Sequence, residues 1–424
     1  MPRTDTTGLT WKLDALNFFL ADVRDGLGPY LAIYLLAVQD WNEASIGVVM
    51  SIAAGAGILA QTPAGALIDR STRKRMLVIV AAILVTLTSV ALPLVHGFAA
   101  VAITQALASA AGSIFPPAIA ALTLGIVGRR AFAPRTGRNE AFNHAGNAVA
   151  ATLAGALAYL FGPVVVFWLL AAMAIGSVVV TLAIPADAID DRVARGLDHD
   201  DVATTGEPVC DDTPHDRPSG FKVLLTCRPL LIFAVATVLF HFANAAMLPL
   251  VGQKLALVNK NLGTTLMSVC IVAAQLVMVP VAMLVGRNAD RLGRKPIFAL
   301  ALAVLALRGA LYPLSDNPYW LVGVQTLDGV GAGIFGALFP LVVADLTHGT
   351  GHFNISQGAI ATAAGIGGAL STTVAGLIVV SAGYSAAFLV LAAIAAVALV
   401  LFVMLMPETR PDTADAPPAR AAAA

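Results

Sequence analysis

The sequence predicts an all-α membrane protein with twelve transmembrane helices in two pseudo-symmetric bundles of six. Of its 424 residues, 58% are hydrophobic and 12% are charged, whereas charged residues make up about a quarter of a soluble domain. Twelve apolar stretches of about 20 residues are each long enough to cross a hydrocarbon core of roughly 30 Å as a helix. Because lipid offers the backbone no hydrogen-bond partners, we expect each stretch to be helical.

An internal repeat is the third observation behind this fold class. A charged stretch, Gly65-Ala-Leu-Ile-Asp69-Arg70-Ser-Thr-Arg73-Lys74-Arg75, returns 221 positions later as Gly286-Arg-Asn-Ala-Asp290-Arg291-Leu-Gly293-Arg294-Lys295. The same offset, or one of 220, relates further pairs: Gly155 and Gly376, Phe167 and Phe388, Gln105 and Gln325, and Ile114 and Ile334. One half of the chain therefore repeats the other.

The spans of the first half follow each other closely. We expect them at Leu13–Leu36, Ala44–Leu67, Arg75–Val95, Phe98–Val127, Arg138–Phe161 and Val164–Ile184. The apolar run near the amino terminus looks like a signal peptide, but Asp22, Arg24 and Asp25 interrupt it. A signal sequence has an uncharged apolar core of roughly 7 to 15 residues, so residues 13–36 are interpreted as the first spanning helix.

A change of composition separates the two halves. From Ala186 to Gly220, prolines and acidic residues replace the apolar pattern, which is typical of a solvated linker. The later spans are expected at Pro229–Gly252, Gly263–Val285, Pro296–Leu314, Tyr319–Asp345, Ile355–Ser381 and Tyr384–Met406. The expected domains are residues 1–185 (first bundle), 186–228 (cytoplasmic linker), 229–406 (second bundle) and 407–424 (disordered tail).

Basic residues predict the orientation. When alternate loops are assigned to opposite sides, 21 of the 25 basic residues fall on the side of both termini and the linker. Lys254 and Lys260 fall opposite, and Arg24 and Arg308 fall inside the membrane. Because lysine and arginine collect in cytoplasmic loops, we expect a multi-pass inner-membrane protein with both termini in the cytoplasm.

The first helix carries the densest intramembrane charge. Such charges cost a few kcal/mol each and usually face a cavity or a partner. Asp22 and Asp25 share one face near the midplane, and Arg24 is turned by roughly 100° from Asp25. One arginine cannot neutralise two acids, and burial favours the protonated form of the other. We expect Asp25, beside the Gly26–Pro29 bend, or else Asp22, to carry a coupled proton and Arg24 to bind substrate; alternatively, these charges lock the helix structurally.

The matching depth of the second half carries His241 and Asn244, which also share a helix face. Asn244 lies 220 positions after Arg24, so we expect it to contact substrate. His241 is either a substrate ligand or a hydrogen-bonded packing residue.

Helix 5 carries a polar stripe of Asn143, His144 and Asn147 in its cytoplasmic half. Amides and an imidazole can bind a polar solute without a fixed charge. Polar side chains also hold membrane helices together, so the stripe is interpreted either as part of the substrate site or as a helix contact.

Two glutamines occupy equivalent positions in helices 4 and 10. We expect Gln105 and Gln325 to contact substrate. Asp328 follows Gln325 by one turn and is a further candidate for proton coupling. Arg308 lies at a comparable depth, so it either pairs with Asp328 or extends to the outer interface.

The repeated charged stretch resembles the loop signature of the major facilitator superfamily of secondary transporters. In each copy a glycine is followed four residues later by an aspartate and then by basic residues, and the two copies extend the resemblance over nearly the whole chain. It implies gating roles at the cytoplasmic rim for Gly65, Asp69, Arg70, Arg73, Lys74, Gly286, Asp290, Arg291, Gly293, Arg294 and Lys295. The first copy departs from the pattern at Thr72, where the second has a glycine.

Two other patterns of the superfamily are missing. Many proton-coupled members have an arginine three residues before a glutamine in helix 4, whereas Ala102 precedes Gln105 here. The antiporter signature of helix 5 ends in Gly-Pro followed by paired glycines, but Gly162-Pro163 leads into valines. A drug/proton antiporter is therefore not favoured by motif.

The sequence predicts a secondary active transporter rather than an enzyme. Its substrate would be a small polar or charged organic solute, moved across the inner membrane by alternating access, with protons as the coupling ion. Both signs of charge and several amides fit a zwitterion or an organic anion at least as well as an apolar drug. We expect a monomer in the lipid bilayer, with no cofactor, metal or nucleic acid. The alternatives are a multidrug-type efflux antiporter and a non-transporting membrane sensor on the same scaffold.

Overall fold

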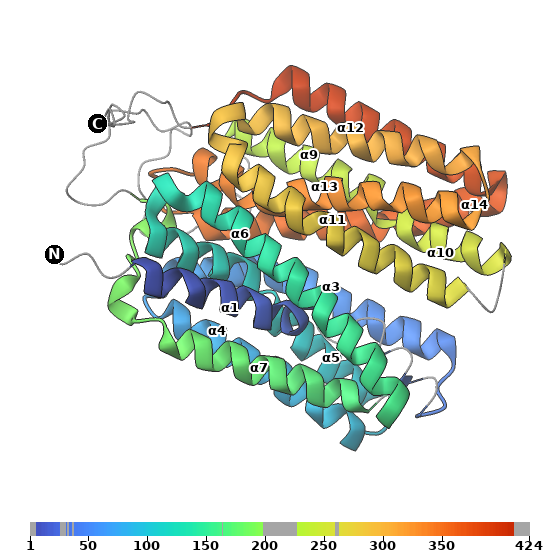
Figure 1. Ribbon diagram of the computed structural model, residues 1–424, viewed down its shortest axis with the longest axis horizontal. Coiled ribbons are helices and arrows are strands. Elements are labelled where there is room, and N and C mark those ends of the chain that lie inside the picture. Colours follow the sequence, from blue (N-terminus) through green and yellow to red (C-terminus); the bar gives the residue numbers. More distant parts are fainter. Residues whose placement is uncertain are drawn as a thin grey trace, which may run out of the picture.

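The structure is a computed structural model that describes residues 6–25, 31, 34–35, 38–162, 164–197, 227–258 and 263–410. We call residues 6–197 the first half and residues 227–410 the second half. Figure 1 shows them as two stacks of long helices, the first half in blue to green and the second in yellow to red. The all-α membrane fold expected from composition is confirmed.

The described residues of the first half include six long helices. They are α1 (Thr6–Asp25), α3 (Glu43–Arg70), α4 (Lys74–Ala91), α5 (Phe98–Gly112), α6 (Phe115–Phe161) and α7 (Val165–Ala183). The second half contains α9 (Arg228–Ala245), α10 (Met247–Val258), α11 (Gly263–Leu292), α12 (Arg294–Leu311), α13 (Pro318–Leu346) and α14 (Phe353–Leu405).

The described helices are consistent with the twelve spans expected from the sequence. Among the described residues, nine segments are long and apolar enough to cross a membrane. Two of them, Phe98–Ala158 and Phe353–Leu405, contain a glycine whose backbone is not helical, Gly128 and Gly383 respectively. Each of these segments therefore holds two spans, and α1 supplies one more, which is consistent with twelve.

The internal repeat is visible in the backbone. Gly128 and Gly349, 221 positions apart, have φ values of 70° and 76°. Gly162 and Gly383, separated by the same offset, have φ values of 85° and 84°. Only glycine adopts this region without steric cost, so the sequence repeat fixes equivalent turns in the two halves.

Two helix pairs form most of the contact between the halves. Helix α11 packs on α6, and α14 packs on α3. Glycines permit the close approach: a Cβ atom on Gly137 of α6 would lie 2.6 Å from the Cα of Gly286 on α11. A side chain at either glycine would therefore separate the two halves.

The fifth expected span begins earlier than the sequence indicated. It is the part of α6 that follows Gly128, and it starts about ten residues before Arg138. The left-handed backbone at Gly128 reverses the chain without a loop. Arg135 and Arg138, which looked like loop or helix-end residues, are consequently placed along α6, where a carboxylate on α1 pairs with both.

Two other spans are interrupted. Expected helix 4 is divided between α5 and α6 at Ser113 and Ile114, immediately before Pro116 and Pro117, because proline can begin a helix but disrupts its interior. The expected span Pro229–Gly252 is divided into α9 and α10.

The first residues of the expected linker and of the expected tail contact the helix bundles. Residues 186–197 contain two short 3-10 turns, and Ala194 is fully buried. Glu408 accepts hydrogen bonds from the backbone N–H groups of Arg294 and Lys295, at 2.7 and 3.2 Å, so it caps α12. Residues 198–226 and 411–424 lie outside the described residues.

We call one end of the molecule the terminal face. It lies at the left in Figure 1 and comprises residues 69–75, 125–130, 186–197, 290–295, 345–354 and 406–410. Both charged repeats lie on this face, because α3 and α11 end there and α4 and α12 begin there.

Candidate functional site

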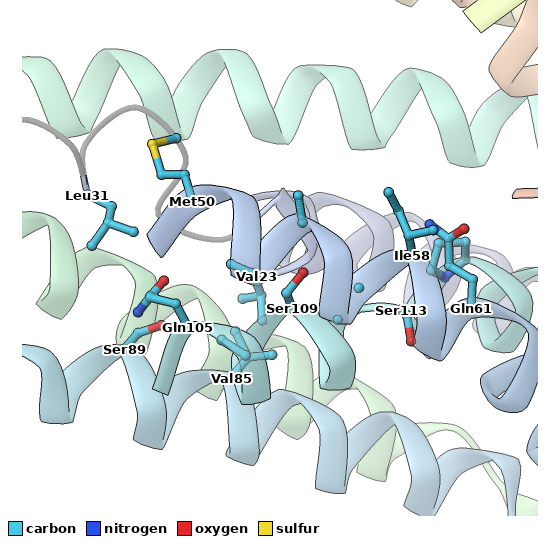
Figure 2. Close-up of a pocket in the computed structure, with 16 residues that line it drawn as sticks. Val23, Leu31, Met50, Ile58, Gln61, Val85, Ser89, Gln105, Ser109 and Ser113 are labelled. Atoms are coloured by element: carbon cyan, nitrogen blue, oxygen red, sulfur yellow. The ribbon is translucent and has the colours of Figure 1, made fainter. Parts of the chain in front are cut away.

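A cavity of about 460 Å³ lies in the first half, between α1, α3, α4, α5 and the start of α6. We call it the first-half cavity. Its polar lining residues are Gln61, Ser89, Gln105, Ser109 and Ser113. Figure 2 shows the amide of Gln105 beside Ser89 at one end, Ser109 in the middle and Gln61 at the other end. The buried Nε2 of Gln105 makes no hydrogen bond to the described residues, so it can donate to a ligand.

The equivalent Gln325 is placed differently. It is fully buried in the second half, accepts a hydrogen bond from the Tyr312 hydroxyl and donates to Asp328 at 3.1 Å. Asp328 also forms an ion pair with Arg308, which is 1% exposed. The pairing expected from their depths is therefore present, and the alternative that Arg308 extends to the interface is wrong.

The asymmetry between the two glutamines follows from their neighbours. An offset of 220 relates Tyr312, Arg308 and Asp328 to Leu92, Thr88 and Ala108. The first half thus lacks the polar partners that satisfy Gln325, and the amide of Gln105 faces a cavity instead.

A second cavity, of about 330 Å³, lies between the two halves. We call it the interface cavity. The first half contributes Gln61, Thr123, Thr136, Asn139 and Glu140, and the second contributes Thr237, His241, Phe335, Phe339 and Gln357. Gln61 and Pro116 line both cavities, so the two cavities adjoin at these residues.

His241 stands in an aromatic wall of the interface cavity. Its ring packs edge-to-face on Phe335 at 4.8 Å between centroids, and Phe335 stacks on Phe339 at 5.4 Å. Its Nδ1 lies 3.0 Å from the carbonyl oxygen of Thr237. A carbonyl only accepts, so Nδ1 carries the hydrogen and Nε2 of the neutral ring is an acceptor. The histidine is therefore both packed and in contact with the cavity.

Glu140 is a cavity residue that the sequence analysis did not select. Its carboxylate lies 3.4 Å from Asn143 Nδ2 and 3.9 Å from His144 Nε2. His144 Nδ1 lies 2.8 Å from Gln275 Oε1 on α11, which links the two halves. Asn143 and His144 are thus brought to a cavity carboxylate. The signal available in the sequence was the position of Glu140, one turn before His144 on the same helix face.

Asp14 on α1 also escaped the sequence analysis. Arg138 binds both of its carboxylate oxygens, with the shortest contact at 2.6 Å from Nη2, and Arg135 pairs with it as well. Arg135 Nε donates to Asn139 at 2.8 Å, and Asn139 donates to Thr123 at 2.7 Å. This chain of polar contacts holds α1 to α6 and extends to the wall of the interface cavity.

Asp69 of the first charged repeat connects the halves. It is 1% exposed, and its carboxylate accepts hydrogen bonds from Ile355 N at 2.8 Å, Asn354 N at 3.3 Å and Asn354 Nδ2 at 2.8 Å. These backbone N–H groups belong to the first turn of α14, so an acid on α3 caps a helix of the other half. A Cβ atom on Gly65 would lie 2.8 Å from Ile355 Cα.

The ordered start of the linker covers the same contact. Ala194 O accepts a hydrogen bond from Asn354 Nδ2 at 3.0 Å, and Gly196 O accepts one from Gly349 N at 2.8 Å. Lys74, which is 1% exposed, pairs with Asp191 at 2.7 Å. The linker therefore bonds to the second half while it stays attached to the first charged repeat.

The second charged repeat is built differently. Asp290 is half exposed and pairs with Arg294 at 2.8 Å. Arg294 also donates to Asp345, at the end of α13, at a distance of 3.0 Å. Arg129, which follows Gly128 on α6, lies 3.7 Å from Asp345. Asp345, absent from the expected set, is thus the carboxylate that faces the other half. Gly293 has φ 93° and immediately precedes α12.

The other residues that the sequence analysis proposed as site residues lie on several different helices. Asp22, Asn147 and Asn244 are half-buried, on α1, α6 and α9 respectively. The side chains of Arg24 and Asp25, and the Gly26–Pro29 bend, lie outside the described residues. Arg70, Arg73 and Arg291 are exposed and Lys295 is half-buried on the terminal face.

Two pseudo-symmetric halves of long helices, a cavity between them and charged repeats at one end define a membrane transporter. Comparison with known sequences specifies the family. A family model described as the Major Facilitator Superfamily matches residues 13–287 and 233–424. The chain belongs to this superfamily of transporters.

Related sequences and solved structures are consistent with this family assignment. Uncharacterized MFS-type transporters of Mycobacterium tuberculosis strains CDC 1551 and H37Rv are each 63% identical over 397 residues, which cover 94% of this chain and 93% of theirs. Among solved structures, the human organic anion transporter MFSD10 has a TM-score of 0.68 at 16% identity, covering 95% of this chain and 100% of its own. FucP, in the outward conformation, has a TM-score of 0.70 at 13% identity, covering 94% and 99%. At these identities the likeness shows the fold alone.

Proposed function

We propose that this protein is a monomeric secondary active transporter that moves a small polar or charged organic solute across the inner membrane. Transport proceeds by alternating access and is driven by protons. The interface cavity is the observation that carries this proposal, because residues of both halves line it. A solute bound there is released to one side or the other when the halves rock against each other.

The contacts at the terminal face fit a reversible gate. Asp69 holds α14, and Arg129 approaches Asp345. Farther along α3 and α14, outside the terminal face, a hydrogen bond of 2.9 Å joins Thr62 to Thr362. Each crosses between the halves through a few polar atoms rather than through an interlocked core. A small number of such bonds can break and reform during each cycle.

The terminal face would be cytoplasmic in this proposal, because it carries both charged repeats and the start of the linker. Two matched substitutions test the orientation. An impermeant thiol reagent applied to intact cells is expected to label Asp316→Cys, near Lys254 at the opposite end, and to leave Asp187→Cys unlabelled until lysis. The reverse pattern contradicts the orientation.

In this proposal Asp25 or Asp22 carries the coupled proton, and Asp328 is the next candidate. The ion pair of Asp328 with Arg308 supports this order, because Asp328 already has a partner inside the second half. Glu140 joins the candidates because it lines the interface cavity.

Transport by purified protein tests the function. Metabolites that raise its melting temperature are loaded into proteoliposomes, and counterflow and accumulation under an imposed pH gradient are measured. We expect exchange of at least one such solute and pH-driven accumulation. Solutes that bind but never cross the membrane would indicate the sensor alternative instead.

A further inference from the structure

Three buried side-chain oxygens in the lining of the interface cavity have no hydrogen-bond partner among the described residues. They are Oε1 of Gln61 on α3, Oγ1 of Thr136 on α6 and Oγ1 of Thr237 on α9. Thr136 and Thr237 are 5% and 1% exposed. Because the large majority of buried polar atoms in folded proteins are hydrogen-bonded, these oxygens need partners, and a solute in the cavity can supply them to both halves at once.

A third threonine of the same cavity shows the difference. The Thr123 hydroxyl donates to Ile119 O one turn earlier and accepts from Asn139 Nδ2, each at 2.7 Å. The protein itself therefore satisfies Thr123. The hydroxyls of Thr136 and Thr237 make neither kind of bond, so both are free to bind a ligand.

The mixture of donors and acceptors defines the ligand chemistry. Each threonine hydroxyl donates one hydrogen bond and accepts others, whereas Oε1 of Gln61 only accepts. Nε2 of His241 also accepts in the neutral ring, because Nδ1 carries the hydrogen toward Thr237 O. An ammonium group only donates and a carboxylate only accepts, but a hydroxyl group does both. A solute with several hydroxyl groups can therefore satisfy the whole set.

The charge in the cavity does not require a charged solute. The carboxylate of Glu140 already lies 3.4 Å from Asn143 Nδ2 and 3.9 Å from His144 Nε2. None of the described lining residues is a lysine or an arginine. An anionic solute would lose its hydration without gaining a cationic lining partner, which is costly, whereas an uncharged solute avoids that cost.

The aromatic wall and the volume define the shape of the solute. Phe335 and Phe339 stack at 5.4 Å between centroids, and His241 packs edge-to-face on Phe335 at 4.8 Å. This wall offers an apolar surface to the C–H face of a ring. The cavity of about 330 Å³ is near the small end of ligand pockets, which measure roughly 300–1,000 Å³. A single ring suits this volume better than a large drug.

We propose that the interface cavity binds a small uncharged solute with several hydroxyl groups on one ring, the chemistry of a monosaccharide. The hydroxyl groups bind Thr136, Thr237 and Gln61, and the C–H face of the ring packs on Phe335 and Phe339. This inference rests on the proposed transport function and narrows its polar or charged solute to an uncharged one.

Matched sugars of different charge test the proposal. Binding of glucose, galactose and mannose to the purified full-length protein is measured by calorimetric titration, each beside its amino-sugar derivative and its uronate. We expect at least one uncharged sugar to bind and both of its charged derivatives to bind at least tenfold more weakly, which corresponds to about 1.4 kcal/mol. Equal or tighter binding of a charged derivative, or no binding by any of the three uncharged sugars, would overturn the proposal.

Two substitutions that preserve side-chain shape locate the site. Thr136→Val and Thr237→Val each remove a hydroxyl that has no partner in the solute-free protein. We therefore expect an unchanged or higher melting temperature without solute, but at least tenfold weaker sugar binding. Thr181→Val on α7 is the matched control outside the cavity. Its buried hydroxyl donates to Ser177 O at 2.7 Å, so this variant should melt at a lower temperature and bind sugar like wild type.

The pair of variants also keeps the test valid if one of them does not fold. Unchanged sugar binding in either folded variant contradicts the assigned contact at that hydroxyl, and unchanged binding in both overturns the proposal. A lower melting temperature of both solute-free variants would show that the protein itself uses these hydroxyls, which also contradicts it.

Counterflow separates this proposal from the transport function. If proteoliposomes exchange a charged solute and no uncharged sugar binds, the proposed solute class fails and the transport function stands. If sugar binding depends on Thr136 and Thr237 but no solute is exchanged, the binding site stands and the transport function fails.

Discussion

Asp69 on α3 caps the first turn of α14 by accepting the backbone N–H groups of Asn354 and Ile355 across the boundary between the halves. A helix is thus capped by an acid that lies 285 positions earlier in the chain. In the proposed transport cycle, we expect this cap to break when the terminal face opens. Asp69 would then report the state of the gate.

The first prediction separates the two charged repeats. Asp69→Asn removes charge-assisted hydrogen bonds worth about 1.5–3 kcal/mol to a buried helix terminus. We expect the transport rate to fall about tenfold or more with solute affinity changed less than threefold. Asp290→Asn is the matched substitution at a half-exposed site that binds Arg294, and its effect on rate should be clearly smaller. Equal effects at both sites, or lost solute binding, would contradict the structural distinction.

The second prediction concerns the glycine contact of α6 and α11. Gly137→Val places a side chain against Gly286 and should prevent closure of the terminal face. Gly155→Val lies on the same helix, with no atom within 4 Å of the added Cβ, and controls for the change in helix propensity. We expect Gly137→Val to bind solute but not complete the cycle in counterflow assays. Normal counterflow by this variant would exclude the contact as part of the gate.

The third prediction tests whether Arg308 and Asp328 are structural. Removing one partner of a buried ion pair costs about 3–5 kcal/mol, whereas replacing both with apolar residues costs far less. Arg308→Leu and Asp328→Leu should each lower the melting temperature, and the double variant should recover most of the loss. If the recovered double variant still accumulates solute under a pH gradient, Asp328 is not the coupling residue.

The fourth prediction addresses the proton. Asp25→Asn should abolish accumulation driven by a pH gradient and retain counterflow, because exchange needs no net proton movement. Asp22→Asn, one helical turn earlier, is the comparison variant. Unchanged pH-driven accumulation by Asp25→Asn would transfer the coupling role to Asp22, Asp328 or Glu140.

The sequence was sufficient for features set by local chemistry. Apolar stretches predicted the spanning helices, because hydrophobicity is read from residues close in the chain. The pairing of Arg308 with Asp328 was one of two interpretations that their depths left open, and the structure shows the ion pair.

Features that depend on tertiary packing were missed. The arginines at 135 and 138 looked like loop or helix-end residues because charge usually marks a loop, and their partner Asp14 lies 121 and 124 positions away. Glu140 was overlooked because its cavity is completed by a helix of the other half. The ordered linker segment has a solvated composition, but Gly349 and Asn354 bind its backbone carbonyls, which composition does not reveal.

The distance across the terminal face tests alternating access most directly. Thr72 and Leu292 are exposed, lie at nearly equivalent positions of the two charged repeats, and belong to opposite halves. Spin labels at Thr72→Cys and Leu292→Cys, in a protein whose native cysteines are replaced, report this distance by double electron–electron resonance in lipid. The account predicts two distance populations in wild type, with the longer one enriched by Asp69→Asn. A single distance that neither Asp69→Asn nor solute changes would contradict it.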